Sequence, residues 1–123
     1  MVRKRVLAIG IEPAFADLSA MPGLTADLVR TFIDAQIERL RSLGYEAESC
    51  LIEPGEAAER TVRTALTAPY DCVIIGAGLR LPPENLLLFE KVTNLVHELA
   101  PRSRIAFNTT AADTAEAVQR WLT

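Results

Sequence analysis

Short apolar runs alternate along the chain with longer segments in which apolar residues recur at helical spacing. Two of the runs, residues 6–9 and 72–75, are apolar throughout, and a glycine follows each. Such runs predict strands that are covered on both faces, as in a parallel sheet. Residues 46–52, where apolar and polar positions partly alternate, predict a strand at a sheet edge, and residues 105–107 predict a further strand.

Helices are expected between the strands. The first begins near Thr25, a favourable N-cap, carries one apolar stripe and ends at Gly44. Gln36 lies near the middle of that stripe, so its amide needs a hydrogen-bond partner if it is buried. Residues 56–68 predict a short second helix.

Proline and capping residues mark the later helices. Pro82-Pro83 is expected to open the third helix, because proline is tolerated in a first turn, and Pro101 follows its end. Asp113 and Glu116 have the spacing of a capping box at the start of a last helix.

Strands and helices therefore alternate strictly, which predicts a single α/β domain over residues 1–123. The expected architecture is a three-layer, doubly wound parallel sheet of four strands in the order 2-1-3-4, with the fully apolar strands in the centre. This layout resembles the flavodoxin-like superfold over essentially the whole chain. Through Gly76–Arg80 and Pro82–Glu84 the chain is also similar to small bacterial proteins of that shape, and this similarity implies no particular activity.

The order 2-1-3-4 also predicts where a ligand would bind. Open α/β sheets bind ligands beyond the carboxyl ends of the strands, at the point where the strand order reverses. Here that point lies between the first and third strands, with the loop after the fourth strand beside it. The residues expected at this crevice are Glu12, Gly76, Gly78, Arg80, Asn108 and Thr109.

The segment from Gly76 to Arg80 allows several interpretations. Gly-x-Gly between a strand and a helix indicates a dinucleotide-binding loop, but Leu81 stands where the third glycine would be. The other interpretation, which is favoured, is that both glycines relieve a tight turn. Arg80 can clamp an anion beside backbone N–H groups, or it can pair with Glu84 or Glu12.

Three functions follow from these interpretations. The first is a non-catalytic module that binds a small anionic ligand or a partner protein at the crevice. The second is a small enzyme that uses Glu12 as base and Arg80 as electrostatic stabiliser, which requires both side chains to face one cavity. The third is a nucleotide-binding domain with a degenerate Gly-x-Gly loop. The sequence assigns no cofactor.

Composition and charge limit the classes of partner that we expect for this chain. A net charge of −3 argues against nucleic acid, which requires clustered Lys and Arg. No apolar run approaches the ~18 residues of a membrane span, and the N-terminus does not resemble a signal peptide, so a cytoplasmic location is expected. One histidine and two separated cysteines, Cys50 and Cys72, assemble no zinc site, and both thiols are expected in the core.

Leu86 and Leu87 are expected to point away from the apolar stripe of the third helix. Exposed neighbouring leucines often mark a contact surface, so the pair indicates a homo-oligomer. They could instead cover the site or seal a contact between helices.

Overall fold

The computed structural model describes residues 3–19 and 22–122, and within them one parallel sheet forms the middle layer. The strands are β1 (Arg5–Ile11), β2 (Glu46–Ile52), β3 (Cys72–Ile75) and β4 (Arg104–Phe107). They lie in the order β2-β1-β3-β4. The predicted three-layer, doubly wound parallel sheet of the flavodoxin-like kind is therefore confirmed.

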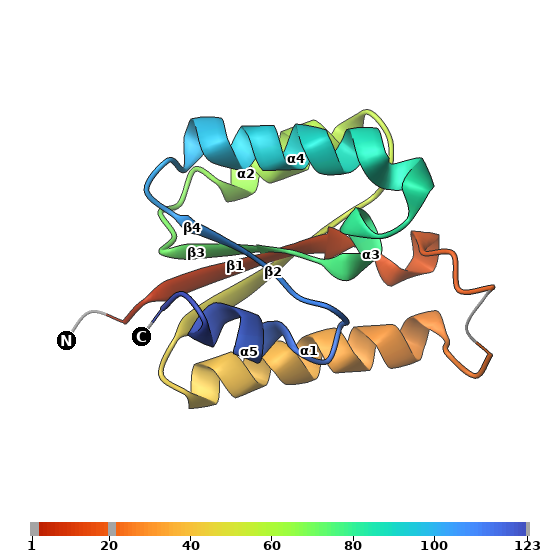
Figure 1. Cartoon of the computed structure of the whole chain (residues 1–123), viewed down its shortest axis with the longest axis horizontal. Coiled ribbons are helices and arrows are strands. Elements are labelled where there is room, and N and C mark those ends of the chain that lie inside the picture. The colour runs from red at the N-terminus through yellow and green to blue at the C-terminus, as the bar shows by residue number, and fades with distance from the viewer. Residues whose placement is uncertain (1–2, 20–21, 123) are drawn as a thin grey trace.

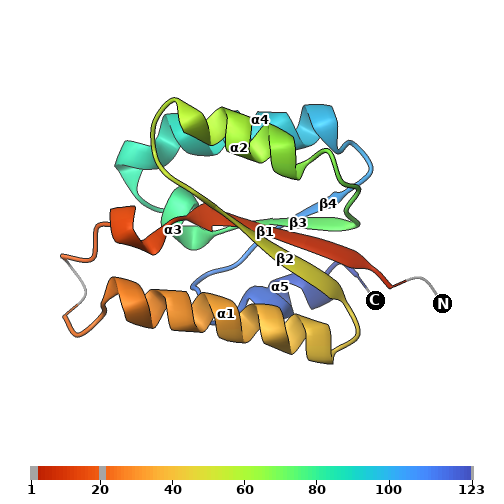
Figure 2. The ribbon, with the colours of Figure 1, turned by 180° about the vertical axis from the view of Figure 1, so that it is seen from behind.

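Helices cover both faces of the sheet (Figure 1). One face carries α1 (Ala26–Ser42) and α5 (Thr114–Gln119), and the other carries α2 (Ala57–Ala65) and α4 (Leu86–Leu99). Figure 2 shows the same two layers from behind.

The first helix begins and ends as predicted. The hydroxyl of Thr25 accepts a hydrogen bond from the backbone N–H of Leu28 at 3.1 Å, which satisfies a donor of the first turn. At the other end Gly44 adopts a φ of 100°, a left-handed conformation that costs glycine little and other residues much. The second helix ends at Ala65, earlier than the sequence predicts.

The core lies on both sides of the two central strands. Leu7 and Ile9 of β1 pack with α2 and α4, whereas Val6 packs with α1 and α5. All four residues of β3 are buried. Cys50 and Cys72 also lie in the core as free thiols, and burial raises the pKa of Cys72 to about 11, so this thiol stays protonated at neutral pH.

The prediction that Pro82-Pro83 opens the third helix is wrong in its detail. A short helix α3 (Ala77–Arg80) follows β3 at once, because the carbonyl of Gly76 accepts hydrogen bonds from the N–H groups of Leu79 and Arg80, both at 3.1 Å. Pro82 then adopts an extended conformation, with a ψ of 126°, and interrupts the helical path. A 3₁₀ turn over Pro83–Asn85 leads into α4, which begins at Leu86.

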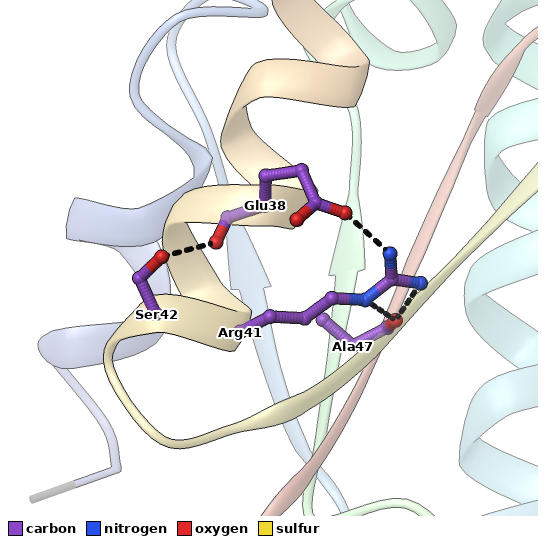
Figure 3. Close-up of polar contacts among 4 residues, drawn as sticks. All are labelled: Glu38, Arg41, Ser42 and Ala47. Carbon is purple, nitrogen blue, oxygen red and sulfur yellow. Dashed lines mark hydrogen bonds and ion pairs between the residues drawn. The ribbon is translucent and has the colours of Figure 1, made fainter.

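The edge position predicted for β2 is confirmed, and the last turn of α1 fastens this strand (Figure 3). Arg41 Nε and Nη2 donate hydrogen bonds to the carbonyl oxygen of Ala47 at 3.2 and 3.0 Å, and Nη1 donates to Glu38 at 2.6 Å. A carbonyl of an edge strand is thus satisfied without a further strand, which reduces the tendency of such an edge to pair with another chain.

Both ends of the described chain lie at the amino edge of the sheet (Figure 1). The carbonyl of Lys4 accepts a hydrogen bond from the N–H of Glu46 at 2.9 Å. The hydroxyl of Tyr45 donates to the carbonyl of Leu122 at 3.1 Å. The carboxyl edge of the sheet lies at the opposite side of the molecule (Figure 1).

Candidate functional site

A decrease in side-chain size along β1 opens a groove at the carboxyl end of the sheet. The residues of β1 that face α1 are Val6, then Ala8, then Gly10, and Ile74 of β3 is followed on this side by Gly76, just beyond the strand. Helix α1 cannot fill the space above these small residues. A cavity of about 440 Å³ results, in the size range of small-molecule sites. We call it the groove.

The groove lies between β1 and β3, where the strand order reverses, as the topology predicts. One wall is the first half of α1, with Val29, Phe32 and Ile33. In that helix only the residues of the second half, Ile37 and Leu40, are buried. The apolar stripe predicted to pack on the sheet therefore does so over half of its length and lines the groove over the rest.

No charged side chain of the described residues lines the groove. Its walls are mainly aliphatic, aromatic and glycine surfaces. The polar side chains in its lining are Gln36, Asn108, Thr109, Thr110 and Thr114. The groove is therefore suited to an uncharged and largely apolar occupant.

Glu12 lies at the start of the 3₁₀ turn Pro13–Phe15 after β1, outside the groove lining. Its carboxylate accepts hydrogen bonds from both terminal nitrogens of the Arg30 guanidinium, Nη1 at 3.1 Å and Nη2 in a short contact. These bonds from Arg30 hold the pKa of Glu12 below its usual range. Glu12 therefore ties the loop after β1 to α1 and is a poor general base.

Arg80 is also engaged within the protein. Its Nη2 donates a hydrogen bond to the carbonyl of Asn108 at 2.8 Å, and its guanidinium lies over the ring of Phe107, 5.5 Å from the centroid. Phe107 in turn packs edge-on against Phe89. Arg80 does not line the groove, so the structure does not bring Glu12 and Arg80 to a common cavity.

Asn108 is buried and connects the loops that border the groove. Its Oδ1 accepts a hydrogen bond from the N–H of Ala77 at 2.7 Å. Its Nδ2 donates to the hydroxyl of Thr114 at 3.0 Å. The side chain lines the groove, but both of its polar atoms already have partners in the protein.

Thr109 belongs to a turn that Asp113 closes. The N–H groups of Thr109 and Thr110 donate to Asp113 Oδ1 at 2.9 and 3.0 Å, and the Thr109 hydroxyl makes a short contact with the other carboxylate oxygen. The capping box predicted for Asp113 and Glu116 is therefore absent: Asp113 is the N-cap residue of α5, but its side chain bonds backward to the loop.

Asp113 makes no side-chain hydrogen bond to the first turn of α5, and Gln36 makes one instead. Its Oε1 accepts a hydrogen bond from the N–H of Ala115 in the first turn of α5, at 2.9 Å. The need for a partner, expected from its place on an apolar stripe, is met by a different helix. Gln36 thus joins α1 to α5 and also lines the groove.

The two glycines of the Gly-x-Gly segment both line the groove, in different surroundings. A Cβ added to Gly76 would lie 3.3 Å from the carbonyl oxygen of Ile9, a tight contact, so the close approach of β1 and β3 favours glycine there. A Cβ added to Gly78 would meet no protein atom within 4 Å.

The groove residues that sequence reasoning missed are mostly small or apolar: Ala8, Gly10, Phe32, Leu51 and Ala111. A search for polar and charged loop residues does not find them. The available signal is the series Val6, Ala8, Gly10 on one face of a strand, because decreasing side-chain volume leaves space beneath a helix.

Other features bear on partners. Leu86 and Leu87 are 54% and 78% exposed, so the predicted outward orientation is confirmed. Within residues 3–19 and 22–122, no three His, Cys, Asp or Glu side chains gather as metal ligands. None of the helices in those ranges has the length and apolar character needed to cross a bilayer.

Comparison of the chain with protein-family models, with curated proteins and with solved structures finds no match.

Proposed function

We propose that this chain is a non-catalytic module that binds a small, uncharged and largely apolar molecule in the groove. The observation that carries the proposal is a groove of ligand size without charged lining, at the crevice where doubly wound sheets bind their ligands. The sequence led us to expect an anionic ligand, with Arg80 as its clamp. Since Arg80 bonds to Asn108 and lies over Phe107, the lining favours an uncharged ligand instead.

Gly78 supports this proposal. Glycine inside a helix costs roughly 0.5–1 kcal/mol relative to alanine, and no protein atom near Gly78 requires its small size. Gly78 lines the groove, and the space around a Cβ added there is open. Glycine there is explained if the space belongs to a ligand that approaches the backbone.

The other functions find less support. An enzyme based on Glu12 and Arg80 requires a shared cavity, and neither side chain lines the groove. A nucleotide site requires donors for phosphate, but the N–H of Ala77 already bonds to Asn108. A protein partner remains an alternative occupant, which the experiment below separates from a small molecule.

The experiment is a fluorescence titration with N-phenyl-1-naphthylamine, a neutral probe that becomes bright in apolar surroundings. We expect saturable binding by the wild-type protein and its loss in Gly78→Leu, which adds a large side chain at a residue that lines the groove. Ala35→Leu is the matched control, because Ala35 is exposed on α1 and lies outside the groove lining. Thermal melts establish that both variants fold. Absence of saturable binding by wild type, or full binding by folded Gly78→Leu, would overturn the proposal and favour a protein partner.

A cytoplasmic location and self-association are parts of the same proposal. Two free thiols fit a reducing compartment. Leu86 and Leu87 lie together at the start of α4, exposed to solvent, where a second copy could cover them.

A further inference from the structure

The amide of Gln36 has one half fixed by the fold. A backbone N–H can only donate, so the atom that faces the N–H of Ala115 at 2.9 Å must be the side-chain oxygen. The orientation of the amide is thereby set, and Nε2 with its two hydrogens points elsewhere.

Nε2 of Gln36 is accessible, and its residue lines the groove. It donates no hydrogen bond to any of the described residues, yet it is not among their buried unpartnered atoms, of which the one found is Arg80 Nε. Gln36 lines the groove and is only partly buried. The amide therefore has donors without a partner among the described residues, on a side chain that lines an otherwise apolar space.

The other side-chain amide of the groove is not free in this way. Both polar atoms of Asn108 have partners, at Ala77 and at Thr114. The Thr109 hydroxyl is bonded to Asp113. Gln36 is thus the groove side chain whose amide nitrogen has no partner among the described residues.

We infer that the ligand carries an uncharged acceptor, such as the carbonyl of a ketone, ester or amide, that bonds to Gln36 Nε2 while its apolar body fills the groove. This inference rests on the proposed function and names its ligand class. A pure hydrocarbon would leave the amide desolvated without a partner, which costs free energy. A carboxylate or phosphate would be buried without a cation, since no charged side chain of the described residues lines the groove.

Two neutral probes separate the acceptor from the apolar body. Prodan, a naphthalene with a propionyl carbonyl, has an acceptor whose hydrogen bonding shifts its emission to the red. N-Phenyl-1-naphthylamine has a similar apolar body and no carbonyl. We expect the wild-type protein to bind both, with the emission of bound Prodan shifted to the red relative to Prodan in an apolar solvent.

Two variants separate the ligand contact from the structural contact of Gln36. Gln36→Glu keeps an oxygen for the N–H of Ala115 but has no donor at about pH 8, where the carboxyl is ionised. Gln36→Met removes both. We expect Gln36→Glu to weaken Prodan roughly tenfold more than N-phenyl-1-naphthylamine, the effect of losing one good hydrogen bond. In Gln36→Met the remaining bound Prodan should lose its red shift.

The outcomes distinguish the two proposals. If wild type binds N-phenyl-1-naphthylamine but Gln36→Glu retains full Prodan affinity, or loses both probes equally, the amide has only a structural role and the inference is overturned. The same holds if wild type binds N-phenyl-1-naphthylamine and not Prodan. If wild type binds neither probe, the proposed function itself fails.

Discussion

Asn108 connects three segments that are distant in the sequence. Its side chain bonds to the N–H of Ala77 and to Thr114, and its carbonyl accepts from Arg80. A polar residue after a strand suggests ligand binding from its type alone. Whether its atoms already have partners in the protein depends on long-range contacts that a sequence pattern does not show, which is why Glu12, Arg80 and Thr109 were also expected at a ligand.

Replacement of Asn108 should therefore affect folding first. In Asn108→Ala the N–H of Ala77 and the hydroxyl of Thr114 lose their partner in a buried site, and we expect the free energy of unfolding to fall by about 2–3 kcal/mol. Urea denaturation measures this. Asn94→Ala, at an exposed position of α4, is the matched control and should leave stability nearly unchanged. Equal stability of the two variants would contradict the structural role of Asn108.

The ion pair of Glu12 and Arg30 predicts a dependence of stability on pH. The hydrogen bonds from Arg30 lower the pKa of Glu12 in the folded protein, so the pair stabilises the fold above the pKa of the unfolded chain and ceases to do so as pH falls. Wild type should be more stable than Glu12→Gln at neutral pH, and the difference should vanish between about pH 5 and about pH 3. Thermal melts across this range measure it, with Glu98→Gln as control for removal of an exposed carboxylate. A difference that stays constant with pH would contradict the role of the pair.

Among the elements, α3 shows best where the sequence pattern was insufficient. The strands and their order follow from apolar runs, because only a doubly covered central strand needs to be apolar throughout. A four-residue helix directly after β3 has no room for a periodic pattern, and Pro82-Pro83 looked like the start of the next helix. Gly76 and Gly78 both line the groove, but their different surroundings depend on how closely β1 approaches.

The two glycines should respond in opposite ways to alanine. Gly78→Ala is expected to raise the free energy of unfolding by roughly 0.5–1 kcal/mol, because alanine loses less conformational entropy and meets no neighbour. Gly76→Ala should lower it, since its Cβ would lie 3.3 Å from the Ile9 carbonyl, which is itself held at 2.8 Å by the Gly76 N–H. Chemical denaturation of the pair tests both. Equal changes in the free energy of unfolding of the two variants would contradict the different surroundings of Gly76 and Gly78.

For the whole molecule, the topology of the sheet could be predicted from the sequence, whereas the lining of the groove could not. The position of the groove follows from the strand order, which the apolar pattern predicts. The space for it does not follow from the loop residues; it comes from the decrease in side-chain size from Val6 through Ala8 to Gly10 on the face of β1 that α1 covers. The sequence contains these three residues, but that they leave a cavity can be inferred only when the helix that covers them is known.

Self-association is a property of the whole molecule, and it remains a prediction. We expect wild type to form larger species as protein concentration rises, and Leu87→Glu to stay monomeric, because a charge at a 78% exposed leucine would be buried in any contact through this surface. Light scattering over a concentration series measures both. Leu43→Glu, at an exposed position at the far end of α1, should associate as wild type does. A wild-type monomer at the highest concentration would remove the leucine pair as an interface.

The opposite placement of the chain ends and the groove has a practical consequence. Lys4 and Leu122 contact Glu46 and Tyr45 at the amino edge of the sheet, whereas the groove opens at the carboxyl edge. A biotin tag or a fused reporter domain joined at either terminus would therefore project away from the groove. Capture on a sensor surface through such a tag would leave the groove facing the flowing solution, so immobilised protein should behave in ligand screening as free protein does.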